Sequence, residues 1–269
     1  LKPLASGEVL GGFMLTELDA GSDAAALKTR ATRVDGGWKL NGSKAWITNG
    51  GVGRYFVTMA RTDPDKGKKG ISAFILDADQ PGVVMGRPEE KMGLRSSKTV
   101  MVALEDAFVP EDAMLGRPGD GLKVAFGGLD GGRIGIAAQA LGIAHRAMDE
   151  SVAYAKARIS FGKPIGEHQM IQTYLAEMEA RLQASRLLVY RAASLKEAGR
   201  PCTVEAATAK LFTTESAVWL CDRAVQIHGG YGYSREYLVE RLYRDVRVTT
   251  IYEGTSEIQR MVIARELLK

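Results

Sequence analysis

Cysteine and histidine are scarce in this chain of 269 residues, which holds two cysteines and three histidines. Cys202 and Cys221 lie far apart and form no C-x-x-C pair, so the sequence indicates neither a disulfide framework nor a zinc site. The histidines, His145, His168 and His228, are scattered without the spacing of metal ligands. We therefore expect no metal centre, and we expect both thiols to be buried and reduced.

Several other signals are missing as well. No apolar run approaches the length of a membrane span, and the first residues lack the basic-then-apolar layout of a signal peptide. Neither the glycine fingerprint of a dinucleotide-binding turn nor a phosphate-loop motif occurs. The net charge of +4 suits an anionic cofactor or substrate and does not require nucleic acid. With 45% apolar residues, the composition is that of a globular protein with a sizeable core.

The first half of the chain is rich in short β-type runs. Asp35-Gly36-Gly37 between two such runs indicates a hairpin, and Asn41-Gly42 predicts a second tight turn. The predicted strands comprise residues 31–34, 38–40, 45–48, 55–60, 71–76 and 99–104. Short strands at such spacing are typical of a small barrel or sandwich.

Helical periodicity replaces this pattern in the second half. Ile171, Leu175, Met178 and Leu182 fall on one face of a long helix. Predicted helices comprise residues 122–159, 166–198, 203–227, 235–245 and 255–268, which fit an antiparallel bundle. We therefore expect an α+β chain, with a β domain over residues 1–115 and a helical bundle over residues 116–269.

One carboxylate near the C-terminus has an unusual setting. Glu253 stands between Tyr252 and Gly254, immediately ahead of a helix start at which Ser256 and Gln259 have capping-box spacing. Such a carboxylate can be held rigidly, Gly254 leaves room for a substrate, and partial desolvation by Tyr252 would raise its pKa and its strength as a base. The alternative is a surface carboxylate favoured only by the helix dipole.

Two segments of the β half could hold a planar or phosphorylated ligand. Residues 13–22 read Phe-Met-Leu-Thr-Glu-Leu-Asp-Ala-Gly-Ser, and a strand that runs into a Gly-Ser turn exposes backbone N–H groups. Trp46-Ile47-Thr48 places an aromatic face and a hydroxyl on one side of a strand. A solvated turn and a core tryptophan are the alternatives.

Two segments of the helical half have similar potential. Arg158-x-x-Phe161-Gly162-x-Pro164, followed by Gln169, could bind phosphate through the guanidinium fork or form a surface ion pair. Gln226-Ile-His-Gly229-Gly230 closes a long helix, so a ligand could approach its backbone, although helix termination explains the glycines equally well.

Taken together and in this order, the segments resemble the acyl-CoA dehydrogenase family. The matching phrases are Thr-Glu-x-x-Ala-Gly-Ser-Asp, Trp-Ile-Thr-Asn, Arg-x-x-Phe-Gly, Gln-x-x-Gly-Gly and Tyr-Glu-Gly-Thr, and residues 129–137 look most like the short-chain, butyryl-CoA branch. The resemblance implies FAD, an acyl-CoA substrate, a homotetramer, and electron-transfer flavoprotein as the electron acceptor. It also implies the cytoplasm of a bacterium or the mitochondrial matrix.

The resemblance further assigns roles to individual residues. FAD would contact Phe13, Leu15, Thr16, Gly21, Ser22, Trp46, Ile47 and Thr48 of the β domain, and Thr255 and Glu257 near the last helix. A neighbouring subunit's FAD would contact Arg158, Phe161, Gln169, Gln226, Gly229 and Gly230. The substrate would contact Ser22, Asp130, Arg133 and Gly254.

Glu253 matches the catalytic base of the family. Some branches draw the base from the helix that carries residues 129–133, where this chain has Gly132, which cannot serve. By the resemblance, Glu253 takes the α-proton of the thioester while the β-hydrogen leaves as hydride to flavin N5, giving a trans-2-enoyl-CoA. The donors to the thioester oxygen would be a ribityl hydroxyl of FAD and the backbone N–H of the base residue.

Other functions of the superfamily stay open as alternatives. An acyl-CoA oxidase would use the same base and flavin, whereas nitroalkane-oxidising relatives use aspartate, so Glu253 counts against them. A DNA-associated member and a non-catalytic scaffold are the remaining classes.

The resemblance also implies a helical domain ahead of the β domain. This sequence begins at Leu1-Lys2-Pro3, near the point where that domain should end. We interpret the chain as a fragment of a longer enzyme, and a lid supplied by a partner chain or a degenerate relative are the alternatives.

Overall fold

The structure is a computed structural model that describes residues 2–269, and its chain divides into two compact units. One unit extends to Lys91 and includes Arg95–Gly128, and the other combines Met92–Leu94 with Leu129–Lys269. The first is built on a β-sheet and the second on helices, which confirms the expected α+β fold class.

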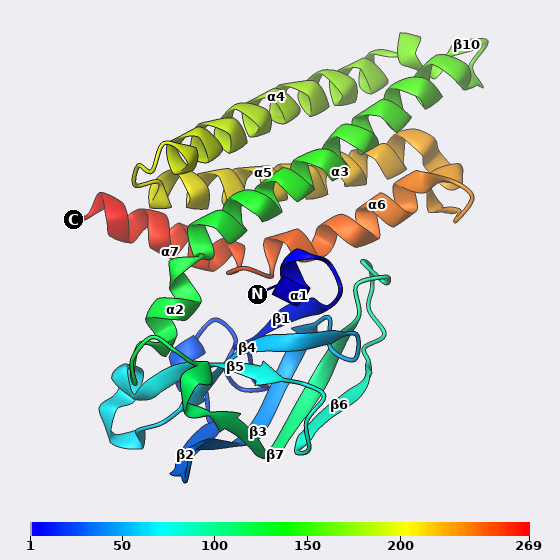
Figure 1. Cartoon of the computed structure of the whole chain (residues 1–269). Helices are drawn as coiled ribbons and strands as arrows, with labels where there is room; N and C mark the ends of the chain where they lie inside the picture. Colours follow the sequence, from blue (N-terminus) through cyan, green and yellow to red (C-terminus); the bar gives the residue numbers. More distant parts are fainter. Residues whose placement is uncertain (1) are drawn as a thin grey trace. The chain divides into compact units, whose positions relative to one another are not determined.

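The first unit is built around an eight-stranded sheet, most of whose strands are labelled in Figure 1. Its strands are β1 (Leu10–Met14), β2 (Arg30–Val34), β3 (Gly37–Thr48), β4 (Gly53–Arg61), β5 (Ile71–Asp77), β6 (Val83–Pro88), β7 (Thr99–Pro110) and β8 (Met114–Leu115). They are arranged in the order β6-β7-β3-β2-β4-β5-β8, and β1 pairs in parallel with β4. The short helices α1 (Lys2–Ala5) and α2 (Gly121–Gly127) complete this unit.

The first predicted turn is confirmed and the second is wrong. Val34 pairs with Gly37, which makes the hairpin between β2 and β3. Asn41 and Gly42, in contrast, lie inside the continuous strand β3, and the register shifts between Leu40 and Gly42. Gly42 has a φ of 152°, and a side chain there would collide with Thr29, so the glycine serves a β-bulge and not a turn.

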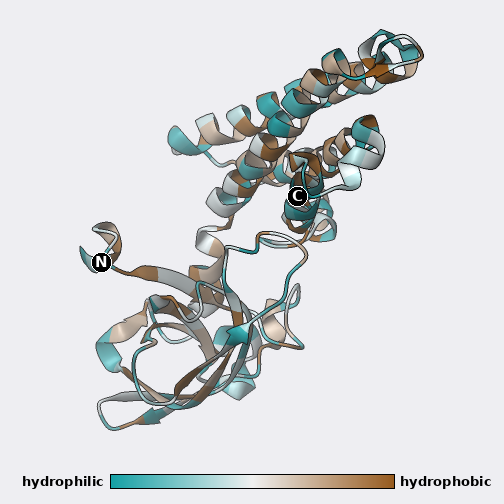
Figure 2. Ribbon diagram, turned by 90° about the vertical axis from the view of Figure 1, so that its right-hand side faces the viewer, coloured by the Kyte–Doolittle hydropathy of each residue, from teal (hydrophilic) through white to brown (hydrophobic). Residues whose placement is uncertain are grey.

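The second unit is a bundle of long helices. Its helices are α3 (Leu129–Ala157), α4 (Gln169–Glu197), α5 (Thr203–His228), α6 (Leu238–Val246) and α7 (Ser256–Leu267). Figure 1 shows α3, α4 and α5 lying side by side, and α5 also packs against α6 and α7. Figure 2 shows apolar and polar residues alternating along these helices. The buried stripe of α3 consists largely of alanines, among them Ala140, Ala144 and Ala147, which lets the helices approach closely.

Two departures from the predicted helices have a clear physical cause, and the remaining helix ends shift by at most three residues. The helix predicted over residues 122–159 is interrupted, since α2 ends at Gly127 and α3 begins at Leu129. Two successive glycines, Gly127 and Gly128, weaken a helix at this point, and the division between the compact units follows Gly128. At the last helix, Thr255 and not Ser256 is the N-cap, and its Oγ1 accepts from the N–H of Ile258 at 3.4 Å. None of the helices between residues 2 and 269 has both the length and the apolar character needed to cross a bilayer.

Candidate active site

Glu253 lies in the irregular segment between the 3-10 helix η6 (Arg247–Thr250) and α7. Its φ is 55° and that of Gly254 is 86°, so two successive residues adopt the left-handed conformation. Glycine adopts it freely, but for a residue with a Cβ it costs on the order of 1 kcal/mol or more. Such a residue persists only where neighbouring contacts hold it, and strained backbone of this kind gathers at functional sites.

The contacts that hold the segment come from α5 and α7. Lys210 Nζ donates to the carbonyl oxygens of Thr249 at 3.0 Å and Gly254 at 2.8 Å. Gln259 Nε2 donates to the carbonyl oxygens of Gly254 at 2.8 Å and Glu253 at 3.3 Å. Gln259 therefore reaches back to carbonyl groups and does not complete the predicted capping box. Together the two side chains fix the peptide groups on both sides of Gly254.

This arrangement leaves the functional groups of Glu253 available. Among residues 2–269, the backbone N–H of Glu253 has no hydrogen-bond acceptor. Its side chain is exposed and extends over Gly132 of α3, where an added methyl group would lie 2.7 Å from Oε2. One residue thus presents a carboxylate and an unpaired backbone donor at the same place.

Gly132→Ala tests the contact between α3 and the carboxylate. Because the added methyl group would crowd the position of Oε2, we expect turnover to fall by roughly 10–100-fold, as displacements of about 1 Å do. The helix itself should gain about 0.5–1 kcal/mol in stability from the alanine. Gly135→Ala is the matched control on the same helix, since nothing lies within 4 Å of its added Cβ. Equal turnover of the two variants, measured by steady-state kinetics, would contradict the assignment.

Tyr252 does not shield the carboxylate as expected. Its hydroxyl instead donates to Gln139 Oε1 of α3 at 2.5 Å, and Glu253 stays exposed. Burial raises the pKa of Tyr252, and the bond to Gln139 opposes that rise. The tyrosine therefore fastens the segment to α3 and does not desolvate Glu253.

Lys210 is a functional candidate that the sequence patterns did not single out. The side chain is fully buried, and burial lowers its pKa to about 8, an effect that the charge of Glu253 opposes and that of Arg133 reinforces. Lys210 lies on the buried face of α5 with Ala206, Thr213 and Ala217, at the spacing of an apolar helix face. That spacing is a signal in the sequence by which the buried lysine could have been found.

The two predicted substrate residues of α3 are bonded to each other. Arg133, 5% exposed, donates from Nη1 to Asp130 Oδ1 at 3.1 Å, and Asp130 Oδ2 accepts from Thr203 Oγ1 of α5 at 2.8 Å. Burial lowers the pKa of Arg133, and the charge of Asp130 opposes this shift. The buried Nε of Arg133 has no partner among residues 2–269. Their contact with a substrate stays a prediction.

In the β unit, the predicted ring-binding residues include several exposed side chains. The register of β3 against β7 shifts between Lys44 and Ile47, and Trp46 has a φ of 59°. Trp46 is 60% exposed and Thr48 is also exposed, while Ile47 is buried. The other predicted flavin contacts of this unit are Phe13, which is 43% exposed, Leu15 and Thr16, which are half-buried, and Gly21 and Ser22, which are exposed.

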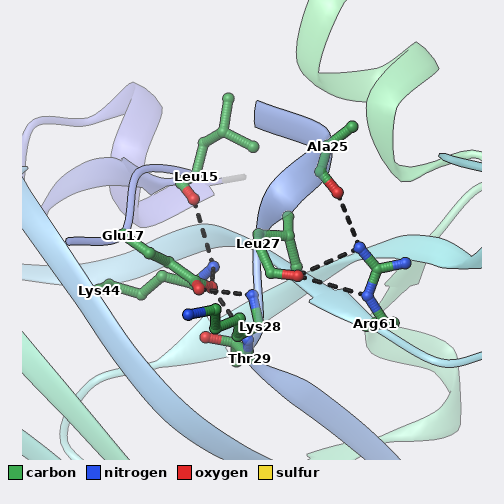
Figure 3. Close-up of polar contacts among 8 residues, drawn as sticks. All are labelled: Leu15, Glu17, Ala25, Leu27, Lys28, Thr29, Lys44 and Arg61. Carbon is green, nitrogen blue, oxygen red and sulfur yellow. Dashed lines mark hydrogen bonds and ion pairs between the residues drawn. The ribbon is translucent and has the colours of Figure 1, made fainter. Parts of the chain in front are cut away.

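A buried ion pair fixes the segment of Leu15 and Thr16. Figure 3 shows Lys44 Nζ bonded to Glu17 Oε1 at 2.8 Å and to the carbonyl oxygen of Leu15 at 3.3 Å. Glu17 also accepts from the backbone N–H groups of Lys28 and Thr29. Burial opposes ionisation of Glu17, but the charge and hydrogen bonds around it lower its pKa overall. The sequence patterns gave neither member of this pair a role.

Two surface pockets of the helical unit contain other predicted residues. The first, of about 350 Å³, is lined by Thr255, Ser256, Glu257 and Arg247, and the buried Oγ of Ser256 has no partner among residues 2–269. The second, of about 450 Å³, is lined by Arg158, Tyr231, Gly229 and Gly230, with the Arg158 guanidinium 5.4 Å from the Tyr231 ring centre. Phe161, Gln169 and Gln226 are exposed and outside its lining.

Known proteins match both units of the chain. Residues 12–107 match the acyl-CoA dehydrogenase middle domain, and residues 119–268 match the acyl-CoA dehydrogenase C-terminal domain. An acyl-CoA dehydrogenase of Bacillus subtilis (strain 168) is 51% identical, and the match covers 98% of this chain and 70% of the relative.

Solved structures agree with these matches. Butyryl-CoA dehydrogenase from Megasphaera elsdenii superimposes with a TM-score of 0.97 at 49% identity, covering 99% of this chain and 70% of that one. A structure described as the electron transferring flavoprotein of Acidaminococcus fermentans gives a TM-score of 0.97 at 46% identity, with coverage of 99% and 70%. The chain belongs to the acyl-CoA dehydrogenase family.

Proposed function

We propose that this protein catalyses the FAD-dependent α,β-dehydrogenation of an acyl-CoA thioester, with Glu253 as the base that removes the α-proton. The observation that carries the proposal is the conformation of Glu253, which presents a carboxylate and an unpaired backbone N–H from one rigid segment. The similarity to a butyryl-CoA dehydrogenase supports a short acyl chain.

The two groups of Glu253 match what a thioester requires. Its α-hydrogen is weakly acidic, and a carboxylate in water removes it slowly. A hydrogen bond from the Glu253 N–H to the thioester oxygen would stabilise the negative charge that develops there. Because the carboxylate is exposed in this chain, the bound substrate has to exclude water from it, which strengthens it as a base.

The chain offers suitable groups for FAD in both units, and members of the family are FAD-dependent flavoproteins. When bound, FAD supplies the two-electron acceptor for the β-hydrogen. The exposed Trp46, Thr48 and Phe13 would contact its ring. Thr255, Glu257 and the unpaired Ser256 Oγ line a pocket at the start of α7, where helix N–H groups favour phosphate oxygens.

The partners follow from the same proposal. The pocket beside Arg158, Gly229 and Gly230 combines a guanidinium with accessible backbone, which suits the FAD of a neighbouring subunit in a homotetramer. The aromatic residues Phe161 and Tyr233, which are 95% and 89% exposed, support an interface there. A chain similar to this one occurs in a structure whose description names an electron transferring flavoprotein. We take this as support for such a protein as the electron acceptor.

A panel of acyl-CoAs mixed anaerobically with the flavin-loaded protein tests the function. We expect the flavin absorbance band to bleach, fastest with the four-carbon thioester and more slowly with long, branched or aromatic ones. Retention of the band with every thioester would contradict the proposal. Rapid reoxidation by air in place of an electron-transfer protein would instead identify an acyl-CoA oxidase.

A further inference from the structure

We propose that Lys210 is a positioning residue for this reaction, one whose ammonium group keeps Glu253 in its left-handed conformation with the backbone N–H free. The inference deepens the proposed function and rests on it. Both hydrogen bonds of the Lys210 ammonium go to backbone carbonyl groups, so its action is through the backbone of the segment that bears the base.

The two hydrogen bonds of Lys210 enclose the base. Its acceptors, the carbonyl oxygens of Thr249 and Gly254, precede and follow Glu253 in the chain. The donor comes from the long helix α5, and its side chain has no exposed surface. A clamp that spans this segment opposes the rotation by which Glu253 would return to an ordinary conformation.

Burying the charged ammonium group of Lys210 costs free energy of desolvation, which a neutral side chain in the same place would avoid. Among residues 2–269 no carboxylate lies within ion-pair distance of its Nζ, and burial of a cation is strongly unfavourable. The charged groups that act on it are Glu253 from the adjoining segment and Arg133 from α3. An amide could make bonds to the same carbonyls at lower desolvation cost, and the charge of Glu253 offsets part of the cost of burying the ammonium group.

The second donor, Gln259, defines what Lys210 alone contributes. The carbonyl oxygen of Gly254 keeps its bond from Gln259 when Lys210 is removed, but that of Thr249 loses its side-chain donor. Loss of Lys210 should therefore loosen the start of the segment while α7 and its Thr255 cap remain in place. The expected effect is local, which separates positioning from general stability.

Lys210→Met and Lys210→Gln, compared with the flavin-loaded wild type, test the inference. We expect kcat for flavin reduction to fall about 100-fold in Lys210→Met with KM nearly unchanged, since a base displaced by about 1 Å loses on that order. Lys210→Gln keeps donors without the charge and should recover part of this loss. Amide hydrogen exchange over residues 249–254 should accelerate in Lys210→Met, whereas exchange in α7 should not change.

Lys156→Met, at the exposed end of α3, is the matched control and should keep wild-type kcat and exchange. A Lys210→Met protein with wild-type kcat, or one with uniformly faster exchange and normal turnover per folded molecule, would overturn the inference. If that variant does not fold, Lys210→Gln with wild-type kcat overturns it. Each variant is compared with a wild type whose flavin band bleaches on addition of the thioester. If the proposed function is wrong, the flavin band of the wild type itself will not bleach, and this result is distinct from any effect of Lys210.

Discussion

Glu253→Gln is expected to lower the rate of flavin reduction by an acyl-CoA by about 10⁴-fold, at the upper end of what a general base contributes. Glutamine has nearly the same size and keeps the backbone, so the N–H donor and the contact with Gly132 should persist. Only the group that accepts the α-proton is lost. Stopped-flow measurement of the flavin band under anaerobic conditions gives the rate directly.

Flavin binding distinguishes this loss of chemistry from a loss of structure. Glu253→Gln should retain bound flavin at the wild-type ratio, because the side chain bonds to no other residue among residues 2–269. Glu177→Gln, an exposed carboxylate on α4, should leave the rate unchanged. A Glu253→Gln rate within tenfold of the wild-type rate would contradict the role of this residue.

Lys44→Met is expected to lower the free energy of unfolding of the β unit by about 3–5 kcal/mol, because it leaves the buried charge of Glu17 unpaired. Glu17 would keep only the N–H groups of Lys28 and Thr29. The segment of Leu15 and Thr16 should loosen with it, so flavin affinity should fall as well. Urea unfolding followed by tryptophan fluorescence measures the first effect.

Lys28→Met provides the control for the buried pair. Lys28 pairs with Asp19 at 2.9 Å, close to the 2.8 Å of Lys44 and Glu17, but the side chains of Lys28 and Asp19 are 75% and 74% exposed. Such surface pairs contribute roughly 0–1 kcal/mol. A loss in Lys44→Met no larger than that in Lys28→Met would contradict the importance of burial.

At acid pH, the free energies of unfolding of the wild type and Lys44→Met should become more similar. The folded pKa of Glu17 is lowered from 4.5, so the unfolded chain binds its proton first as the pH falls. The stability that the pair contributes is therefore complete above pH 4.5 and is lost as the pH falls through the folded pKa. The gap between the two proteins should be constant near neutral pH and narrow below pH 4.5.

Local sequence signals predicted which segments form helices and strands better than they predicted where turns and bulges interrupt them. The hairpin at Asp35-Gly36 and the long helices followed from turn residues and from apolar periodicity. Asn41-Gly42 has the composition of a turn, yet close packing against Thr29 makes Gly42 a bulge within β3. Tertiary contact decided between these outcomes, and no short window of the sequence contains Thr29 and the partner strand β7 together.

The candidate site was also predicted only in part, because some of its contacts join residues that are distant in sequence. The place of Glu253 immediately ahead of the last helix followed from the helix-start signals after it. The sequence named Gly132 only as a residue that cannot supply the base, and its closeness to the Glu253 carboxylate appears only in the folded chain. The shielding by Tyr252 was wrong because the tyrosine hydroxyl bonds to Gln139, a partner 113 residues away in sequence.

Lys44 and Lys210 were missed because a lysine in a sequence is ordinarily interpreted as a surface charge. Both are fully buried, and their ammonium groups bond to partners that are distant in sequence. For Lys44 only the packing of the folded chain reveals this burial, whereas the place of Lys210 on the apolar face of α5 was a signal in the sequence.

Exchange of the substrate α-hydrogen with solvent tests the role of Glu253 most directly, because it follows the proton and not the electrons. A four-carbon acyl-CoA labelled with deuterium at its α-carbon is incubated with the flavin-loaded protein without an electron acceptor, and the thioester is analysed by mass spectrometry. With the wild type, the deuterium at the α-carbon should exchange with solvent protons, whereas with Glu253→Gln it should stay on the thioester. Equal washout by the two proteins would mean that another group removes the proton.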